Sequence, residues 1–210
     1  MKKKTTAAPR LGRPPATDSA DTRQRILDIA RIAFAARGYD ASTNRSLGAD
    51  AGITAGAIYH YFGSKLDLYS AVHDDVQARV YDRFDDAIVG LPTFKAKVEA
   101  VLETAHDMNK EDPSLAQFLG ALRVDMRRNS ELKAALQHAT ARRQDFFDRI
   151  VDHGVRTGEI APAKRAEVAA LVLTLLIGLT DAVSGNPNNH RLAVDGIKEL
   201  FEGTLFGPVR

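Results

Sequence analysis

The sequence has no cysteine and no tryptophan in 210 residues. The lack of cysteine excludes disulfides, thiol catalysis and every zinc site that uses cysteine, and it fits a reducing cytosol. A chain of this length can still bury a substantial core without covalent cross-links. We therefore expect one large domain or two small ones, held together by packing alone.

Long apolar runs are missing as well. The longest run without a charged residue lies between Glu167 and Asp181, and it is well short of the roughly 20 apolar residues that cross a bilayer. Met1 to Ala8 contains three lysines with no apolar stretch behind them, which is not the pattern of a secretory signal. These features predict a cytoplasmic protein with no membrane partner.

Motifs of common enzyme classes do not occur either: there is no glycine-rich phosphate loop, no HExxH and no GxSxG. Histidine and aspartate are adjacent in His73-Asp74-Asp75, His106-Asp107 and Asp152-His153. Because neighbouring residues on a helix point in different directions, these pairs are poor ligand sets for a metal. We expect no catalytic activity, no metal and no cofactor.

The charged residues are segregated along the chain. Residues 1–65 contain 11 Lys and Arg against 5 acids, a net charge of +6, whereas the remainder has 18 against 22, a net charge of −4. This distribution is typical of a polyanion-binding module joined to a neutral or acidic domain. The alternative is a basic tail that only aids solubility.

Apolar residues recur at helical spacing along the whole chain, and no alternating apolar and polar run of useful length occurs. The pattern therefore predicts an all-α fold. The expected helices cover residues 22–37, 44–51, 55–61, 65–82, 94–110, 113–128, 131–156, 163–184 and 189–205.

The chain begins with a segment of different composition. Residues 1–20 are rich in Lys, Pro, Thr and Ala, cannot offset the entropy of ordering, and are predicted to form a basic flexible arm. In the first helix, Asp21 and Gln24 are spaced as an N-cap and its partner, and Gly38 is expected to close the helix. The apolar stripe of this helix consists of Ile26, Ile29, Ala30, Ala33 and Phe34.

The most informative stretch runs from Thr43 to Lys65 and reads TNRSLGADAGITAGAIYHYFGSK. Thr43 can cap a short helix that Gly52 ends, since a residue without Cβ permits a left-handed turn. Ile53 is expected to be buried against the preceding helices, and Thr54 can cap a second short helix. Two short helices joined by a tight glycine turn are typical of a DNA-binding helix-turn-helix.

This stretch resembles the tetracycline-repressor (TetR) family of regulators over Thr22 to about Val72. The matching positions are Thr43, Leu47, Ala51-Gly52-Ile53, Ile58-Tyr59-His60-Tyr61-Phe62 and Ser64-Lys65. Gly48 departs from the family, which usually has Ala there. Because a glycine inside a helix costs about 1 kcal/mol relative to Ala, we expect a slightly softer helix at this point.

The resemblance implies a three-helix helix-turn-helix domain over residues 21–66 and a C-terminal helical bundle for ligand binding and dimerisation over residues 67–210. It implies a dimeric repressor that binds a palindromic operator in double-stranded DNA and is released by a small-molecule effector of unknown identity. An activator, or an architectural DNA-binding protein without an effector, is the alternative.

Polar groups near the second short helix are candidate DNA contacts. The side chains of Tyr59, His60, Tyr61 and Lys65 can reach phosphate oxygens, although one tyrosine could instead belong to the core, as we expect for Phe62. Arg45 matches a family position that approaches a base edge, and its guanidinium suits guanine; a solvated charge is the alternative. The full predicted set is Thr43, Arg45, Thr54, Ala55, Gly56, Ala57, Tyr59, His60, Tyr61, Lys65, Arg10 and Arg13.

The two arm residues enter that set through a short motif. Arg10-Leu11-Gly12-Arg13-Pro14 resembles the Arg-Gly-Arg-Pro core of hooks that carry arginines into a narrow minor groove. Because Ala55, Gly56 and Ala57 offer no bidentate hydrogen bond, the arm is predicted to add specificity. A plain tail is the alternative.

Apolar faces in the C-terminal part could enclose a ligand, or they could be ordinary core. The candidate ligand residues are Phe94, Phe118, Leu122, Met126, Phe146, Phe147 and Ile150. Helix 65–82 is the predicted lever between ligand and DNA. The basic residues Arg123, Arg127, Arg128, Arg142 and Arg143 are interpreted first as a solvated basic face, and an anionic ligand is the alternative.

The last two predicted helices are the family's usual dimerisation pair. The predicted homodimer interface consists of Val168, Leu171, Val172, Leu175, Leu176 and Leu179, which form a wide apolar surface. A symmetric four-helix interface would bury this surface, and packing inside one chain is the alternative. Two-fold symmetry would match a palindromic operator.

Overall fold

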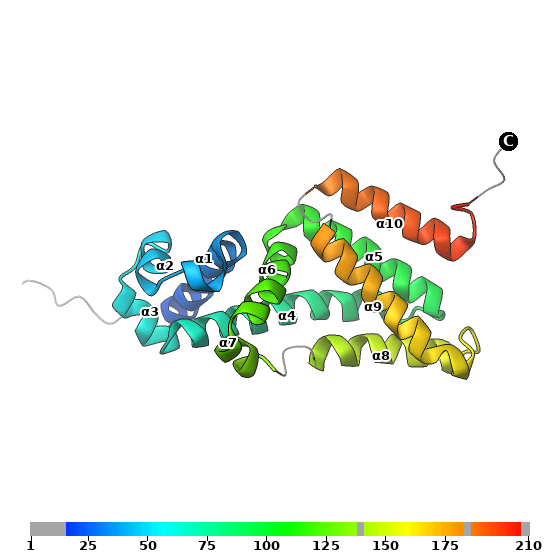
Figure 1. The fold of residues 1–210 in the computed structure, drawn as a ribbon, viewed down its shortest axis with the longest axis horizontal. Coiled ribbons are helices and arrows are strands. Elements are labelled where there is room, and N and C mark those ends of the chain that lie inside the picture. The colour runs from blue at the N-terminus through cyan, green and yellow to red at the C-terminus, as the bar shows by residue number, and fades with distance from the viewer. Residues whose placement is uncertain (1–15, 138–140, 183–185, 207–210) are drawn as a thin grey trace, which may run out of the picture.

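The computed structural model describes residues 16–137, 141–182 and 186–206, and these ranges contain only helices and their connections (Figure 1). The all-α prediction is confirmed. The elements are α1 (Ala16–Ala41), α2 (Asn44–Asp50), α3 (Ala55–Phe62), α4 (Lys65–Ile88), α5 (Phe94–Glu111), α6 (Ser114–Arg128), α7 (Ser130–Ala135), α8 (Ala141–Arg156), the 3-10 helix η1 (Pro162–Lys164), α9 (Arg165–Ala182) and α10 (Pro187–Glu202).

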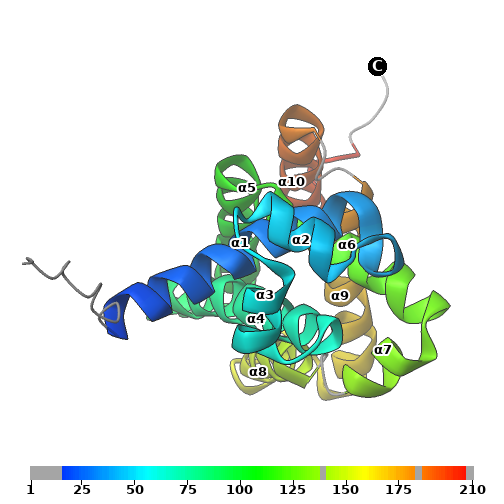
Figure 2. The ribbon, with the colours of Figure 1, turned by 90° about the vertical axis from the view of Figure 1, so that its left-hand side faces the viewer.

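The first three helices form one end of the molecule, called here the end unit, and the remaining helices form a bundle. Figure 1 shows α1, α2 and α3 together at the left, with α4 running from them into the bundle. Seen from that end, α2 and α3 face the viewer (Figure 2). Helix α6 packs against both α1 and α9, so α4 and α6 are the two elements that join the end unit to the bundle.

The first helix differs from the prediction at its start. It begins at Ala16, so the expected N-cap at Asp21 is wrong, and the helix includes the last residues of the predicted arm. No helix breaker separates Ala16 from Asp21, and alanine favours helix. The rest of the prediction is confirmed: Phe34 is fully buried with most of its stripe, and Gly38 interrupts the helix at φ 77°.

The predicted helix over residues 131–156 is wrong, because α7 ends at Ala135 and α8 begins at Ala141. A single helix of that length would be a straight rod about 39 Å long. Leu132 and Leu136 are buried where α7 meets α4 and α6, whereas Phe146 and Ile150 are buried on α8 against other helices. Both apolar groups can reach the core only if the helix is interrupted.

Helix α9 contains the long uncharged run of the sequence. Val172 and Leu179 on one side of it are 2% and 4% exposed, whereas Leu171 is 46% exposed. Val168, Ala169 and Leu176 also pack against the core of the same chain. Among the described residues, no helix combines the length and apolar character that crossing a membrane needs.

Candidate functional site

Local hydrogen bonds define the helix-turn-helix. Thr43 Oγ1 accepts a 3.1 Å hydrogen bond from the Ser46 amide, and the Ser46 hydroxyl accepts one of 3.0 Å from the Thr43 amide, which makes a capping box. Thr54 Oγ1 accepts a 3.1 Å hydrogen bond from the Ala57 amide. Gly52 between the two helices has φ 66°, a conformation that favours glycine. These local features of the turn match the prediction.

Gly48 has a packing role that the sequence did not reveal. Its carbonyl accepts a 2.8 Å hydrogen bond from the Ile53 amide, and a Cβ on Gly48 would lie 2.9 Å from the Ile53 carbonyl oxygen. The turn therefore crosses α2 too closely for a side chain. Glycine in place of alanine at this position thus leaves room for the turn.

Helix α3 has a buried face and an exposed face. Ile58 and Phe62 are buried, which confirms the expectation that Phe62 belongs to the core. Tyr61 is partly buried against the core, as in the alternative that assigned one tyrosine to packing. Tyr59 is 56% exposed and His60 is also exposed, so these two side chains are available on the outer surface.

Among the described residues, two of the predicted DNA contacts are Lys or Arg, and their surroundings differ. The Lys65 ammonium donates a 2.8 Å hydrogen bond to the Tyr39 carbonyl and lies 3.9 Å from the Tyr39 ring centroid. It therefore stabilises the start of α4 within the protein. Arg45 is exposed on α2 and forms no ion pair with any residue in the described ranges. Of these two charged groups, the Arg45 guanidinium is the one without a partner among the described residues.

The remaining predicted DNA residues are divided between structural positions and the undescribed arm. Gly56 is exposed, and Ala55 and Ala57 are half-buried at the start of α3. Arg10 and Arg13 lie outside the described residues. The DNA-binding role of the whole set stays a prediction.

A second candidate site is a cavity in the bundle, enclosed by α4, α5, α6, α8, α9 and α10. Its space is about 820 Å³ when the mouth open to solvent is included. Concave, largely apolar sites with a few polar groups are typical of small-molecule binding. Much of the wall is apolar, with Val80, Met108, Leu119 and Leu176 among the lining residues.

Most of the predicted ligand residues pack in the core beside this cavity. Phe147 lines the cavity, and Ile150 lines a smaller apolar one next to it. Phe118 instead packs against Tyr69, with ring centroids 5.2 Å apart and ring planes tilted by 45°. Phe94, Leu122, Met126 and Phe146 also pack in or against the core. The predicted residues lie on helices that line the cavity but mostly on another face, because an apolar stripe does not show whether it meets a helix or a cavity.

Two polar side chains of the cavity wall, Gln77 and Asn109, were not named from the sequence, and Arg143 was named only as a member of the basic cluster. Gln77 on α4 is 9% exposed and Asn109 on α5 is 4% exposed. The Gln77 Oε1, both amide atoms of Asn109 and the Arg143 Nε are buried and have no hydrogen-bond partner among the described residues. The only sequence signal for the two amides was a polar residue on an apolar helix face. Because buried polar groups are nearly always paired, this grouping makes the cavity a candidate binding site.

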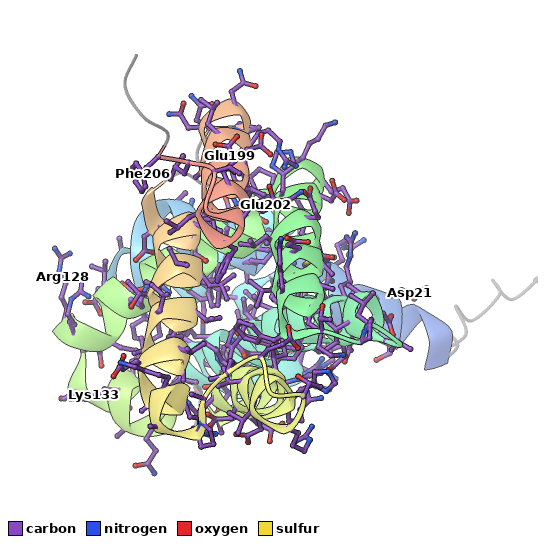
Figure 3. All side chains as sticks on the ribbon, turned by 90° about the vertical axis from the view of Figure 1, so that its right-hand side faces the viewer. Asp21, Arg128, Lys133, Glu199, Glu202 and Phe206 are labelled. Atoms are coloured by element: carbon purple, nitrogen blue, oxygen red, sulfur yellow. The ribbon has the colours of Figure 1, made fainter. Side chains whose placement is uncertain are left out.

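The basic cluster of the sequence is divided by the structure. Arg123 and Arg143 line the cavity, whereas Arg128 lies on the outside (Figure 3) and Arg142 pairs with Asp82 on the surface. Arg123 forms a two-bond ion pair with Asp181, in which its Nε lies 3.0 Å from Oδ2. Burial, followed by the charges of Arg143 and Arg127, holds the pKa of Arg123 below its ordinary value. Positive charge therefore gathers at one part of the wall.

Buried polar contacts connect the cavity to the end unit. Asp112 lines the cavity and accepts a 2.7 Å hydrogen bond from the Arg31 guanidinium of α1. The same guanidinium donates a 2.9 Å hydrogen bond to Ser114, the first residue of α6. Arg31 is only 3% exposed. Asp112 and Ser114 belong to the junction of α5 and α6, which we call the α5–α6 corner. A displacement of this corner would therefore move α1 through Arg31.

The predicted dimer residues occupy different sides of α9. Val172 and Leu179 are buried in the chain's own core, and Val168 and Leu176 pack against it. Leu171 is exposed on α9, as are Leu192 and Leu200 on α10. Part of the predicted set thus follows the alternative of packing within one chain, while exposed leucines remain on both helices.

One of the histidine–aspartate pairs does meet, contrary to our expectation from helix geometry. His73 Nδ1 lies 3.0 Å from Asp74 Oδ1. Within the described ranges, however, no group of three or more His, Cys, Asp or Glu side chains is arranged to hold a metal ion.

Comparison with known proteins agrees with this geometry. The family described as "Bacterial regulatory proteins, tetR family" matches residues 26–72. The HTH-type transcriptional regulator UidR of Escherichia coli (strain K12) is 25% identical over 191 residues, which cover 90% of this chain and 95% of UidR. The uncharacterized HTH-type transcriptional regulator TtgW of Pseudomonas putida is 32% identical over 96 residues, which cover 46% of this chain and 72% of TtgW.

Solved structures share the whole fold at lower identity. Salmonella enterica GusR superposes with a TM-score of 0.72 at 22% identity, covering 91% of this chain and 99% of GusR. The regulator FadR from Bacillus subtilis in complex with stearoyl-CoA gives 0.73 at 21%, covering 87% and 99%. AibR in complex with isovaleryl coenzyme A and operator DNA gives 0.70 at 15%, covering 85% and 97%.

Proposed function

This chain belongs to the TetR family of DNA-binding transcriptional regulators, and we propose that it is a repressor whose dimer leaves a palindromic operator when a small molecule enters the bundle cavity. The observation that carries the proposal is the separation of an exposed helix-turn-helix from a largely apolar cavity, with Arg31 bonded to Asp112 and Ser114 between them. A protein that only shapes DNA would have no need of that cavity.

In the proposed complex, α3 enters the major groove of the operator. Tyr59 and His60, on its exposed face, bind phosphates and set the register. Arg45 reads a guanine edge with its unpaired guanidinium. The small side chains at the start of α3 allow its backbone to approach the bases closely. The arm residues Arg10 and Arg13 add minor-groove contacts in this proposal.

The switch works through α4 and α6, which line the cavity and contact the end unit. A ligand that prefers a conformation with a displaced α5–α6 corner would move α1 through Arg31. Such a ligand acts by its different affinity for the two conformations. A change from 99:1 to 1:99 in their populations needs about 5.5 kcal/mol of preference.

Ligand response is supported by fold neighbours that were crystallised with acyl-coenzyme A molecules, FadR with stearoyl-CoA and AibR with isovaleryl coenzyme A. AibR was also crystallised with operator DNA. Dimerisation is supported by the exposed leucines Leu171, Leu192 and Leu200 on α9 and α10. A symmetric interface would cover them and place two recognition helices on one face. We also propose that the protein acts in the cytoplasm without catalysis.

Selection of fragments from random double-stranded DNA by the full-length protein tests the proposal. We expect an inverted repeat to be enriched, bound by two copies of the chain. The change Arg45→Ala should lower operator affinity about tenfold and relax the preference at one base position per half-site. Arg142→Ala removes the same charge from the distant surface of α8 and should leave affinity unchanged. Failure to enrich any duplex would overturn the proposal.

A further inference from the structure

The cavity wall holds more unpaired polar groups than packing explains. Gln77, Asn109 and Arg143 belong to α4, α5 and α8, and all three line the same space. Within the described residues, four of their buried nitrogen and oxygen atoms have no hydrogen-bond partner. Apolar residues at the two amide positions would avoid the cost of unpaired polar groups. These side chains are therefore suited to pair with a bound molecule.

The charges around the cavity point to one unpaired cation. Asp181 pairs with Arg123, and Asp112 pairs with Arg31. Arg143 lines the cavity and has no ion-pair partner among the residues that the structure describes. Its planar guanidinium can bind a carboxylate through two parallel hydrogen bonds. A positively charged ligand would instead be repelled by Arg143.

The remaining wall is apolar and comes from the same helices. Val80 and Phe84 of α4, Met108 of α5, Leu119 of α6 and Phe147 of α8 all line the cavity. A hydrocarbon or ring body placed among them would be removed from water, which favours binding. The wall thus combines an apolar body site with one cationic position and two amides.

We propose that the cavity binds a carboxylate amphiphile, an organic monoanion whose carboxylate pairs with Arg143, whose apolar body lies among Val80, Met108 and Phe147, and whose amide or hydroxyl group meets Gln77 and Asn109. This inference rests on the proposed function and names the class of its effector. A single negative charge matches the one unpaired guanidinium of the described wall. A coenzyme A thioester would bring several phosphate charges, and the described wall has no further unpaired cation to bind them.

The test is calorimetric titration of the full-length protein with N-acylglycines from hexanoyl to dodecanoyl, each of which has an apolar chain, an amide and one carboxylate. The matched N-acylglycinamides lack the charge, and the decanoyl pair is compared with decyl phosphate and decanoyl-coenzyme A. We expect the best acylglycine to bind at least about tenfold more tightly than its amide, because a charge-assisted hydrogen bond is lost with the charge. The phosphate and the thioester should bind more weakly than the acylglycine.

Variants locate the binding site. Arg143→Gln should reduce acylglycine affinity by at least about tenfold and leave affinity for the neutral amide nearly unchanged. Arg142→Gln removes the same charge from the neighbouring surface position and should change neither. Gln77→Leu and Asn109→Leu should raise the melting temperature of the ligand-free protein while weakening acylglycine binding. A purely structural role for these amides would not produce these opposite effects.

Several outcomes would overturn the inference: no acylglycine binds, acid and amide bind equally, Arg143→Gln behaves as Arg142→Gln, or the phosphate or thioester binds most tightly. Operator binding is measured on the same samples so that the two proposals can fail separately. If the ligand-free wild type does not bind operator DNA, that result counts against the proposed function alone. Acylglycine binding that leaves operator affinity unchanged counts against release and leaves the ligand class intact.

Discussion

The backbone amide of Tyr39 donates a 2.9 Å hydrogen bond to the buried Asp125 carboxylate, from the end unit to α6 of the bundle. The same carboxylate oxygen accepts a 3.0 Å hydrogen bond from the Tyr69 hydroxyl of α4. Burial, and then the charge of Asp125, raises the pKa of Tyr69, so its hydroxyl remains a donor at physiological pH. Asp125 therefore connects α6 to α4 and to the residue that follows the helix interruption at Gly38.

Replacement of Asp125 by alanine should destabilise the protein by about 2–4 kcal/mol, because the Tyr39 amide and the Tyr69 hydroxyl would both be left buried without an acceptor. Asp125→Asn keeps one acceptor oxygen and should cost about 1 kcal/mol. Urea unfolding measures both changes. Asp145→Ala, at an exposed carboxylate of α8, is the control and should cost less than about 0.5 kcal/mol. Equal effects of Asp125→Ala and Asp145→Ala would contradict the role of Asp125.

Arg31 provides a second connection, which a lysine cannot reproduce. Its Nε, Nη1 and Nη2 bind Ser114, Asp28 and Asp112, whereas the three N–H donors of an ammonium share a single nitrogen. We expect Arg31→Lys to cost about 2 kcal/mol in urea unfolding and to weaken the effect of any cavity ligand on operator affinity. Ligand affinity itself should change little.

The matched control is Arg79→Lys, because Arg79 pairs with Asp28 and Asp75 from a half-exposed position on α4. That change should cost less than about 1 kcal/mol and leave the coupling intact. An Arg31→Lys protein that responds to ligand as the wild type does would show that the switch does not pass through this corner.

Gly48→Ala should fail to stabilise the protein, although alanine is the better helix former by about 1 kcal/mol. The new Cβ would lie 2.9 Å from the Ile53 carbonyl oxygen, so the backbone of the turn must shift. Gly56→Ala is the control, since its Cβ would meet its nearest atom at an ordinary 3.7 Å, and it should be stabilising. Thermal unfolding compares the two. A melting temperature that rises as much for Gly48→Ala as for Gly56→Ala would contradict the close crossing.

The helix-turn-helix was predictable because short-range rules determine it. Thr43 and Thr54 cap helices through bonds to residues three positions later, and Gly52 supplies the left-handed turn. The buried Ile58 and Phe62 follow helical spacing. Each of these features depends on neighbours in the sequence, so it can be read without knowledge of the tertiary structure.

The cavity was predictable only as far as its helices, because its wall is set by long-range packing. Phe118 and Leu119 are adjacent on α6, yet Phe118 packs against the Tyr69 ring and Leu119 lines the cavity. No local rule distinguishes these two faces. The interruption after Ala135 was missed for the same reason, since the residues that follow are compatible with helix and only the positions of Leu136 and Phe146 in the core require a break.

Helix α10 is attached to α5 through Glu103. Arg191 donates hydrogen bonds of 2.6 and 3.0 Å to this carboxylate, and Lys198 donates one of 2.7 Å. The bonds from Arg191, followed by those from Lys198, lower the pKa of Glu103 to about 2 despite the opposing effect of its partial burial. Its ordinary pKa is 4.5. A group with a lowered pKa in the folded state stabilises that state above its unfolded pKa and loses this effect as the pH falls.

We therefore expect Glu103→Gln to reduce the free energy of unfolding at pH 7, and the difference from wild type to shrink between pH 4.5 and pH 2. Because the Glu103 side chain is 38% exposed, solvent screens the interaction and the loss at pH 7 should be no more than about 1 kcal/mol. Urea unfolding of both proteins across this range isolates Glu103, since every other acid titrates in both. Glu199→Gln, at an exposed position of α10 labelled in Figure 3, is the control and should show no such convergence. A Glu103→Gln difference that stays constant or grows as the pH falls would show that these ion pairs do not hold α10 in place.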